Sequence, residues 1–255
     1  MCIRDREQAQ LNKLERICQK LDLQPGDHLL EIGTGWGGFA AYAAHHYGCR
    51  ITTTTISREQ HTQAAALINE RGLEDRVTLL LQDYRDLQGT FDKAVSIEMF
   101  EAVGLRFYDT YFGAVERLLK PGGLFLMQTI TMNERRFPDY IRSTDWIQQY
   151  IFPGAELASL KEIHASLPRC STLDVAHQED MGQHYARTLA EWRRRFHGAW
   201  ERIAPLGFDA PFRRLWDWYL ASCEGAFRER TISVVQLLMA KTGTSHPLPG
   251  EPWGR

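Results

Sequence analysis

A glycine-rich stretch near the start of the chain carries the first chemical signal. It reads Glu31-Ile-Gly-Thr-Gly-Trp-Gly-Gly38, and it follows an apolar run and opens an alanine-rich segment. Glycines permit positive φ angles and let a ligand approach the backbone closely. Gly33, Gly35 and Gly37 are therefore candidate cofactor-binding residues. Glu31 joins them, since its carboxylate can accept a hydrogen bond from the loop or reach the amino group of a ligand.

The spacing of the glycines also matches the G-x-G-x-x-G pattern of dinucleotide-binding proteins. That pattern calls for an acidic residue about 20 positions later to hold the ribose, whereas this chain has four threonines at positions 52–55. Asp83 instead follows the third predicted strand, where its carboxylate can accept a hydrogen bond from an adenine amino group. These features favour S-adenosylmethionine over NAD, and over a glycine turn that binds nothing.

Alternating strand and helix patterns surround this loop and must position it. Apolar and β-branched runs predict strands at 28–32, 49–55, 77–81, 94–97, 124–130 and 231–240. Helical patterns fall between them, which is typical of a parallel sheet covered by helices. We expect a doubly wound α/β fold with a mostly parallel, seven-stranded sheet, in one domain spanning residues 1–255.

The pattern changes after residue 132. An irregular aromatic stretch is followed by two amphipathic helices, predicted at 183–203 and 208–227. We expect residues 132–230 to include a cap over the carboxyl edge of the sheet, where open α/β sheets bind ligands.

Composition excludes several classes of function. The net charge of −2 gives no basic field for nucleic acid. Five widely spaced cysteines without a C-x-x-C pair indicate reduced thiols and a cytoplasmic protein. No residue spacing predicts a metal site, since His45, His46 and His61 have no companion ligands.

Several separate stretches resemble the cyclopropane-fatty-acyl-phospholipid synthase family, which includes the mycolic acid cyclopropane synthases. The resemblance runs from about Glu7 to Ala240. The stretches that carry it are Glu7-Gln-Ala-Gln-Leu-Asn-Lys-Leu14, the glycine loop, Thr55-Ile-Ser-Arg-Glu-Gln60, Leu81-Gln-Asp-Tyr-Arg-Asp-Leu87, Ser96-Ile-Glu-Met-Phe-Glu-Ala-Val-Gly104, Tyr150-Ile-Phe-Pro-Gly154 and Gly225-Ala-Phe-Arg228.

The resemblance implies roles at the cofactor. Gly33 and Gly35 would pass under the methionine part of S-adenosylmethionine. The remaining positions would contact its nucleoside, with the ribose held by Thr55 and Gln60 and the adenine flanked by Asp83 and Tyr84.

The resemblance also implies a catalytic site. Glu101, Ile130 and Tyr185 match positions that bind a bicarbonate ion in the family, and Gln128 stands where the better-known members have a histidine ligand. A methyl group transferred to a carbon–carbon double bond leaves a carbocation, and bicarbonate would then remove a proton. The implied substrate is an unsaturated acyl chain of a phospholipid, and the product is a cyclopropane or a methyl- or methylene-branched chain.

Two departures leave alternatives open. Gln128 and Ala102 replace histidines of the family, which puts ring closure in question. The family also has an N-terminal segment with a cysteine before this point, and Cys2 lacks that context, so we expect a fragment that binds cofactor weakly. A small-molecule N- or O-methyltransferase and a non-catalytic cofactor-binding protein remain as rival functions. Arg193-Arg-Arg195, beside Trp192 and Trp200, is either a solvated helix face or a contact with the inner membrane surface.

Overall fold

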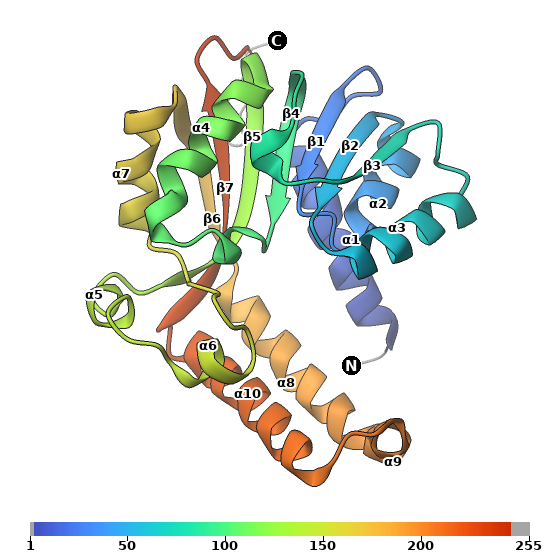
Figure 1. Ribbon diagram of the computed structural model, residues 1–255, viewed down its shortest axis with the longest axis vertical. Coiled ribbons are helices and arrows are strands. Elements are labelled where there is room, and N and C mark those ends of the chain that lie inside the picture. Colours follow the sequence, from blue (N-terminus) through green and yellow to red (C-terminus); the bar gives the residue numbers. More distant parts are fainter. Residues whose placement is uncertain (1–2, 246–255) are drawn as a thin grey trace.

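A twisted sheet of seven strands forms the centre of the protein (Figure 1). The computed structural model describes residues 3–245, and the side chains from residue 7 onward. Strands β1 to β5 are parallel, and β7 runs antiparallel to both of its neighbours, in the order β3-β2-β1-β4-β5-β7-β6. The strands are β1 (His28–Ile32), β2 (Arg50–Thr55), β3 (Val77–Leu81), β4 (Phe91–Ile97), β5 (Leu119–Met132), β6 (Leu173–Asp180) and β7 (Ile232–Lys241). This topology confirms the predicted fold class.

Helices cover both faces of the sheet, so the chain has two apolar layers. Along β5, Phe125 and Met127 belong to one layer, while Leu124 and Leu126 belong to the other, because successive side chains of a strand point to opposite faces. The first layer packs against α4 (Tyr108–Leu118) and α7 (Leu160–Cys170). The second packs against α1 (Ile3–Lys20), α2 (Gly38–Tyr47) and α3 (Arg58–Glu70).

The helix boundaries follow from local sequence signals. Ser57 caps α3, as predicted, because its hydroxyl accepts a hydrogen bond from the Gln60 N–H at 3.2 Å. Gly48 ends α2 in the left-handed conformation that glycine adopts without strain. The turn that follows α3 contains Gly72, with φ +61°.

The cap comes from two separate parts of the chain, residues 133–159 and 181–231, with α7 and β6 of the main layers between them. Figure 1 shows its helices gathered beyond the carboxyl ends of the strands. The cap helices are α5 (Phe137–Tyr140), α6 (Trp146–Tyr150), α8 (Gly182–Gly198), α9 (Trp200–Ile203) and α10 (Ala210–Arg228). Helices α8 and α10 pack side by side with an apolar seam that includes Leu189, Leu220 and Phe227.

Two details differ from the sequence-based expectation. A single helix over 183–203 is wrong, because α8 ends at Gly198 and Trp200 begins a separate short helix. Strand β6 was not among the predicted ranges, since its sequence Leu-Asp-Val-Ala-His-Gln-Glu-Asp is mostly polar. It lies at the edge of the sheet, where one side of the strand stays open to water.

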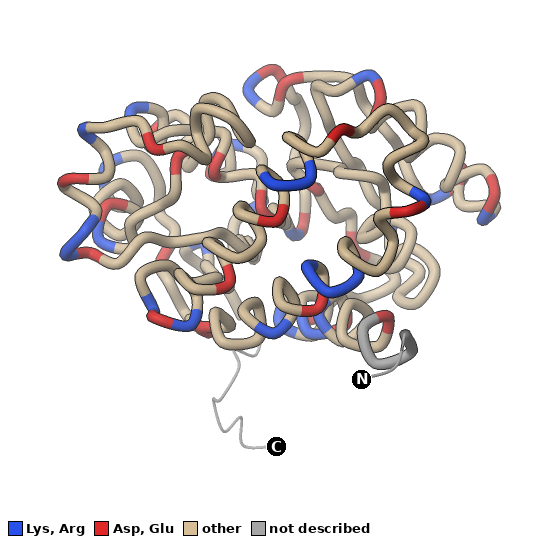
Figure 2. Tube along the Cα trace, turned by 90° about the horizontal axis from the view of Figure 1, so that it is seen from below, with Lys and Arg blue, Asp and Glu red and all other residues tan. Residues whose placement is uncertain are grey.

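The described helices and the charges on the surface bear on how the protein meets its surroundings. Across residues 3–245, no helix combines the length and the apolar character that a membrane crossing requires. Figure 2 shows lysine and arginine interspersed with aspartate and glutamate along the trace, without a large region of one sign.

Candidate active site

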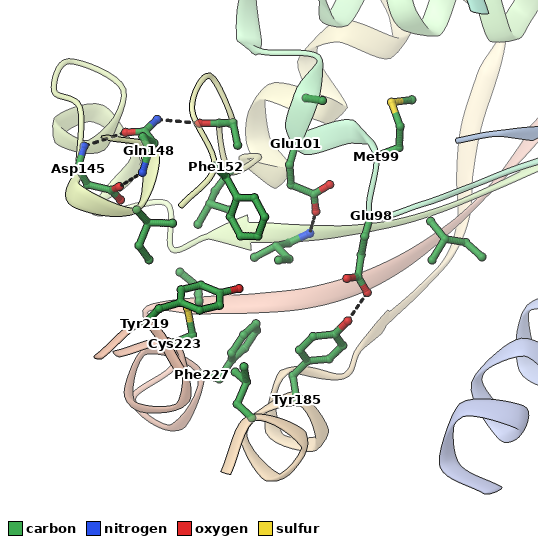
Figure 3. A pocket seen from close by; sticks show the side chains of 18 of the residues that line it. Glu98, Met99, Glu101, Asp145, Gln148, Phe152, Tyr185, Tyr219, Cys223 and Phe227 are labelled. Atoms are coloured by element: carbon green, nitrogen blue, oxygen red, sulfur yellow. Dashed lines mark hydrogen bonds between the residues drawn. The ribbon is translucent and has the colours of Figure 1, made fainter. Parts of the chain in front are cut away.

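A cavity of about 460 Å³ lies between the carboxyl edge of the sheet and the cap. One end is formed by the glycine loop, the middle by the ends of β4 and β5, and the other end by aromatic and aliphatic side chains of the cap (Figure 3). The described residues that line it are Gly33, Gly35, Gln60, Ile97, Glu98, Met99, Glu101, Ala102, Ile130, Tyr140, Asp145, Ile147, Gln148, Phe152, Ala155, Leu157, Tyr185, Leu189, Trp192, Tyr219, Cys223, Phe227 and Ile232.

Each glycine of the loop has a different reason to lack a side chain. Gly33, Gly35 and Gly37 have φ angles of +100°, +52° and +85°. A Cβ on Gly33 would lie 2.9 Å from the Met99 side chain, and one on Gly37 would lie 3.1 Å from the Cβ of Ala64. A Cβ on Gly35 would have no protein atom within 4 Å. Gly35 therefore faces open space in the cavity, which a ligand can fill.

Glu31 lies below this loop rather than in the cavity lining. It is 2% exposed, and its Oε2 accepts a hydrogen bond of 2.6 Å from the Thr53 hydroxyl. The Thr53 hydroxyl also pairs with the Thr34 hydroxyl at 2.7 Å, so the loop and β2 are tied together. Burial raises the pKa of the Glu31 carboxyl to about 8, against the lowering effect of the Thr53 hydrogen bond.

The positions assigned to the nucleoside are divided by the structure. Thr55 donates its hydroxyl hydrogen to Gln60 Oε1 at 2.8 Å, and Gln60 lines the cavity. Asp83 and Tyr84 lie just after β3 and do not line it. The Asp83 carboxylate is bonded to the Arg85 guanidinium at 2.7 Å, and these bonds lower the pKa of Asp83. The Tyr84 ring packs edge-on against Tyr111.

Glu101 has one carboxylate oxygen held by the protein and one left over. Its Oε1 accepts hydrogen bonds from the Ile130 N–H at 2.6 Å and the Thr129 hydroxyl at 3.1 Å. Its Oε2 is buried and has no partner among the described residues. Burial raises the pKa of the Glu101 carboxyl to about 7, and the nearby charge of Glu98 adds to this. Convergence of Glu101 with the end of β5 follows from the pairing of β4 and β5, as the sequence predicted.

Glu98 is a second carboxylate in the same cavity, and sequence reasoning did not single it out. Its Oε1 accepts a hydrogen bond of 2.6 Å from Gln128 Nε2 and a second one from the Tyr185 hydroxyl. Figure 3 shows Glu98 reaching from the end of β4 to meet Tyr185 of α8. Its φ of +51° is uncommon for a residue with a side chain. A signal was present, because Glu98 and Glu101 stand three residues apart after a predicted strand.

Gln128 does not line the cavity, because it is fully buried in β5. Besides donating to Glu98, it accepts a hydrogen bond of 2.9 Å from Gln236 Nε2 of β7. Gln236 Oε1 accepts from Lys20 Nζ of α1 at 2.6 Å. The Lys20 ammonium also forms a 2.6 Å ion pair with Glu179 of β6. We call these three residues, Gln128, Gln236 and Lys20, the buried polar chain.

The cap is joined to the catalytic segment by backbone hydrogen bonds. The Glu156 N–H donates to the Glu101 carbonyl at 2.8 Å. The Ala158 N–H donates to the Ile130 carbonyl at 3.1 Å, and the Met132 N–H donates to the Ala158 carbonyl at 2.8 Å. The loop before α7 therefore continues the end of β5 and fixes the wall beside Glu101.

Aromatic groups predicted to line a dry pocket are partly in place. Tyr140 and Phe152 line the cavity, and the Tyr140 hydroxyl accepts a hydrogen bond from the Leu157 N–H at 2.9 Å. Trp146 and Tyr150 do not line it, and Trp146 lies against Trp218 of α10. Cys2, which the resemblance connected with the site, lies outside the described residues.

The sheet order, the glycine loop at the end of β1 and the cavity beside it define a class I methyltransferase fold. The mycolic acid cyclopropane synthetase family matches residues 4–237. This chain belongs to that family.

Curated relatives and solved structures agree with this assignment. The chain is 42% identical over 235 residues to the cyclopropane-fatty-acyl-phospholipid synthase of Escherichia coli (strain K12), covering 92% of this chain and 59% of that protein. It is 40% identical over 235 residues to the tuberculostearic acid methyltransferase UfaA1 of Mycobacterium tuberculosis (strain H37Rv), again over 92% of this chain and 55% of the relative. The structure of the cyclopropane synthase MmaA2 from Mycobacterium tuberculosis is similar with a TM-score of 0.84 and 27% identity, covering 92% of this chain and 85% of that one. The chain thus spans under two thirds of the length of these two curated relatives.

Proposed function

We propose that the protein transfers a methyl group from S-adenosylmethionine to the double bond of an unsaturated fatty acyl chain of a phospholipid. The product is a cyclopropane or a methyl- or methylene-branched chain. One observation carries the proposal: a single cavity joins a glycine loop, two glutamates and an aromatic cap end in that order. This order suits a donor, a proton-handling centre and an acyl chain.

The loop fits S-adenosylmethionine. The space in front of Gly35 holds no protein atom within reach of a Cβ, and Gln60 offers polar atoms beside it. The bound group supplies an electrophilic methyl on a sulfonium, which a weakly nucleophilic double bond requires. Glu31 supports the loop from below through Thr53, and Asp83 and Tyr84 are proposed to contact the adenine after Asp83 exchanges its bond with Arg85.

The protein's own groups then manage a positive charge on the acyl chain. The cap encloses the apolar end and keeps water from trapping the cation. The rings of Phe152, Tyr219 and Phe227 present faces and edges to that end, and aromatic faces stabilise nearby cations. Glu101 Oε2 lies unpaired at the inner end, where a negative or shared-proton oxygen lowers the energy of the cation.

Bicarbonate, which the resemblance implies as the proton acceptor, fits the described arrangement poorly. Its expected donors are already used, because Tyr185 and Gln128 donate to Glu98 and the Ile130 N–H donates to Glu101. We therefore derive no step through this ion.

Contact with the inner face of the membrane belongs to the proposal, since the acyl substrate resides there. Exposed aromatic side chains lie around the cap: Tyr150, Phe152, Trp192 and Trp218. The neighbouring arginines are largely neutralised, as Arg193 pairs with Asp217 at 2.6 Å and Arg194 with Glu191 at 2.6 Å. Aromatic insertion rather than arginine charge is the proposed mode of contact.

The test is lipid mass spectrometry after incubation with S-adenosylmethionine and vesicles of unsaturated phospholipid. Wild type is expected to add one CH₂ unit at a former double bond. Glu101→Gln keeps the Oε1 acceptor for Ile130 but removes the free carboxylate oxygen, so turnover should fall by ~10²–10⁴. A methyl group found on nitrogen or oxygen would show a small-molecule methyltransferase, and tight cofactor binding without any product would show a non-catalytic protein.

A further inference from the structure

Glu98 is held as an oriented hydrogen-bond acceptor inside the cavity. Two donors from different parts of the chain, Gln128 on β5 and Tyr185 on α8, both reach its Oε1. Its backbone N–H is fixed as well, donating to the Gln128 carbonyl at 2.8 Å. The second oxygen, Oε2, takes no printed hydrogen bond from the residues that the structure describes, and the residue stays open to the cavity.

The buried polar chain decides which atom of Gln128 faces Glu98. An ammonium only donates, so Lys20 requires the oxygen of Gln236. The amide nitrogen of Gln236 must then donate to the oxygen of Gln128, which leaves the nitrogen of Gln128 to donate to Glu98. Every bond in this sequence has one direction, and the direction favours an anionic acceptor at Glu98.

Glu98 also stands between the two halves of the cavity. Its neighbour Met99 closes on the glycine loop, since a Cβ on Gly33 would lie 2.9 Å from the Met99 side chain. On the other side, the Tyr185 ring that holds Glu98 packs against Phe227 of the acyl end, with ring centroids 5.3 Å apart. A carboxylate here lies between the proposed donor site and the proposed acyl site.

We infer that Glu98 is the proton acceptor of the reaction, a carboxylate built into the chain in place of a bound bicarbonate ion. This inference rests on the proposed function. Both anions are planar, carry one negative charge and accept hydrogen bonds through oxygen. Glu98 accepts from Tyr185 and Gln128, the groups that the resemblance assigned to bicarbonate.

The step balances without a further reactant. Methyl transfer uses the π electrons of the double bond to form a carbon–carbon bond and leaves a carbocation on the chain. Glu98 Oε2 then takes a proton from the new methyl group or from an adjacent carbon. The electron pair of that C–H bond closes the ring or forms a double bond, and Glu98 ends as a neutral carboxylic acid that returns its proton to water when the product leaves.

The experiment uses the whole chain, with three variants. Glu98→Gln keeps the shape and the acceptor oxygen but not the charge. Glu98→Gly empties the space, and its φ of +51° suits glycine. Glu70→Gln is the matched control, because Glu70 is exposed on α3 and away from the cavity. Each protein is tested for lipid product with and without bicarbonate, for cofactor affinity by calorimetry, and for isotope-labelled bicarbonate binding by NMR.

Wild type and Glu70→Gln should be equally active with and without bicarbonate and should not bind the labelled ion. Glu98→Gln should lose ~10²–10⁴ in turnover while keeping its cofactor affinity. Glu98→Gly should bind labelled bicarbonate and regain about tenfold or more activity with it. Bicarbonate binding by wild type, full activity of Glu98→Gln, or loss of its cofactor affinity would each overturn the inference. A wild type without any lipid product overturns the proposed function instead, and the labelled-ion measurement still decides the role of Glu98.

Discussion

The hydroxyl of Tyr185, on the first long helix of the cap, donates a hydrogen bond to the carboxylate of Glu98 at the end of β4. Eighty-seven positions separate the two residues in the sequence. Desolvation and the charge of Glu98 raise the pKa of the Tyr185 hydroxyl well above its usual value, so it stays a donor across the physiological pH range. Cap and sheet therefore meet at a charged group of the reaction centre rather than only through apolar contacts.

Removing this hydroxyl tests the contact directly. Tyr185→Phe keeps the ring that packs on Phe227 but deletes the donor to Glu98. A hydrogen bond to a charged group contributes about 1.5–3 kcal/mol, so turnover should fall by about tenfold to a hundredfold. Product formation on unsaturated vesicles measures this, and calorimetry should show unchanged cofactor affinity. Unaltered turnover would mean that the bond has no part in the reaction.

The glycine loop gives a prediction with a matched control. Gly35 and Gly72 both have positive φ, +52° and +61°, and a Cβ on either would meet nothing within 4 Å. Gly35→Val and Gly72→Val should therefore cost similar backbone strain, about 1–2 kcal/mol. Only Gly35→Val fills the proposed ligand space, so only this variant should lose S-adenosylmethionine binding in calorimetry. Equal affinity of the two variants would remove Gly35 from the cofactor site.

The far end of the buried polar chain should influence the reaction. Lys20 and Arg16 both bind Glu179, but only Lys20 reaches Gln236. Lys20→Met leaves the two buried amides without a fixed direction, so turnover should fall by about tenfold, because Glu98 loses part of its support. Stability should fall by about 1–3 kcal/mol, since Gln236 Oε1 loses its buried donor.

Arg16→Met is the control for Lys20→Met, because it removes the exposed partner of Glu179 and leaves the amides unchanged. Urea unfolding and kcat are measured side by side for both variants. If Lys20→Met lowers stability while kcat stays at the wild-type value in the folded protein, Lys20 has a purely structural role.

Glu31 leads to a prediction about pH. Burial raises its folded pKa from 4.5 to about 8, so the folded state binds more protons than the unfolded state between these values. The contribution of Glu31 is therefore most favourable below pH 4.5 and is lost as pH rises toward 8. Glu31→Gln is neutral at every pH and its Oε1 can still accept from Thr53. The unfolding free energy of this variant, relative to wild type, should rise between pH 5 and pH 8 by on the order of a few kcal/mol. A constant difference across that range would contradict the assignment.

Much of the fold could be predicted because its signals are local. Strands β1 and β3 have the predicted bounds, and Ser57 caps α3 as expected. These features depend on residues within one turn or one strand. The break at Ala199 and the polar edge strand β6 depend instead on how distant segments pack, which periodicity does not report.

The site divides in the same way. Glu101, Ile130 and Tyr185 were predicted to converge, and all three line the cavity. The acceptor role of Glu98 could not be read from the sequence, because it depends on partners 30 and 87 positions away. Gln236 and Lys20 are 216 positions apart and gave no common signal before the order of β5, β7 and β6 was known.

The buried polar chain also gives the protein a natural spectroscopic reporter. Gln128 and Gln236 are fully shielded from water, so their side-chain amide hydrogens exchange slowly with solvent. One amide hydrogen of Gln128 points at the carboxylate whose charge changes when a proton arrives. Its resonance therefore registers the protonation state of Glu98 from inside the sheet, without a label in the cavity.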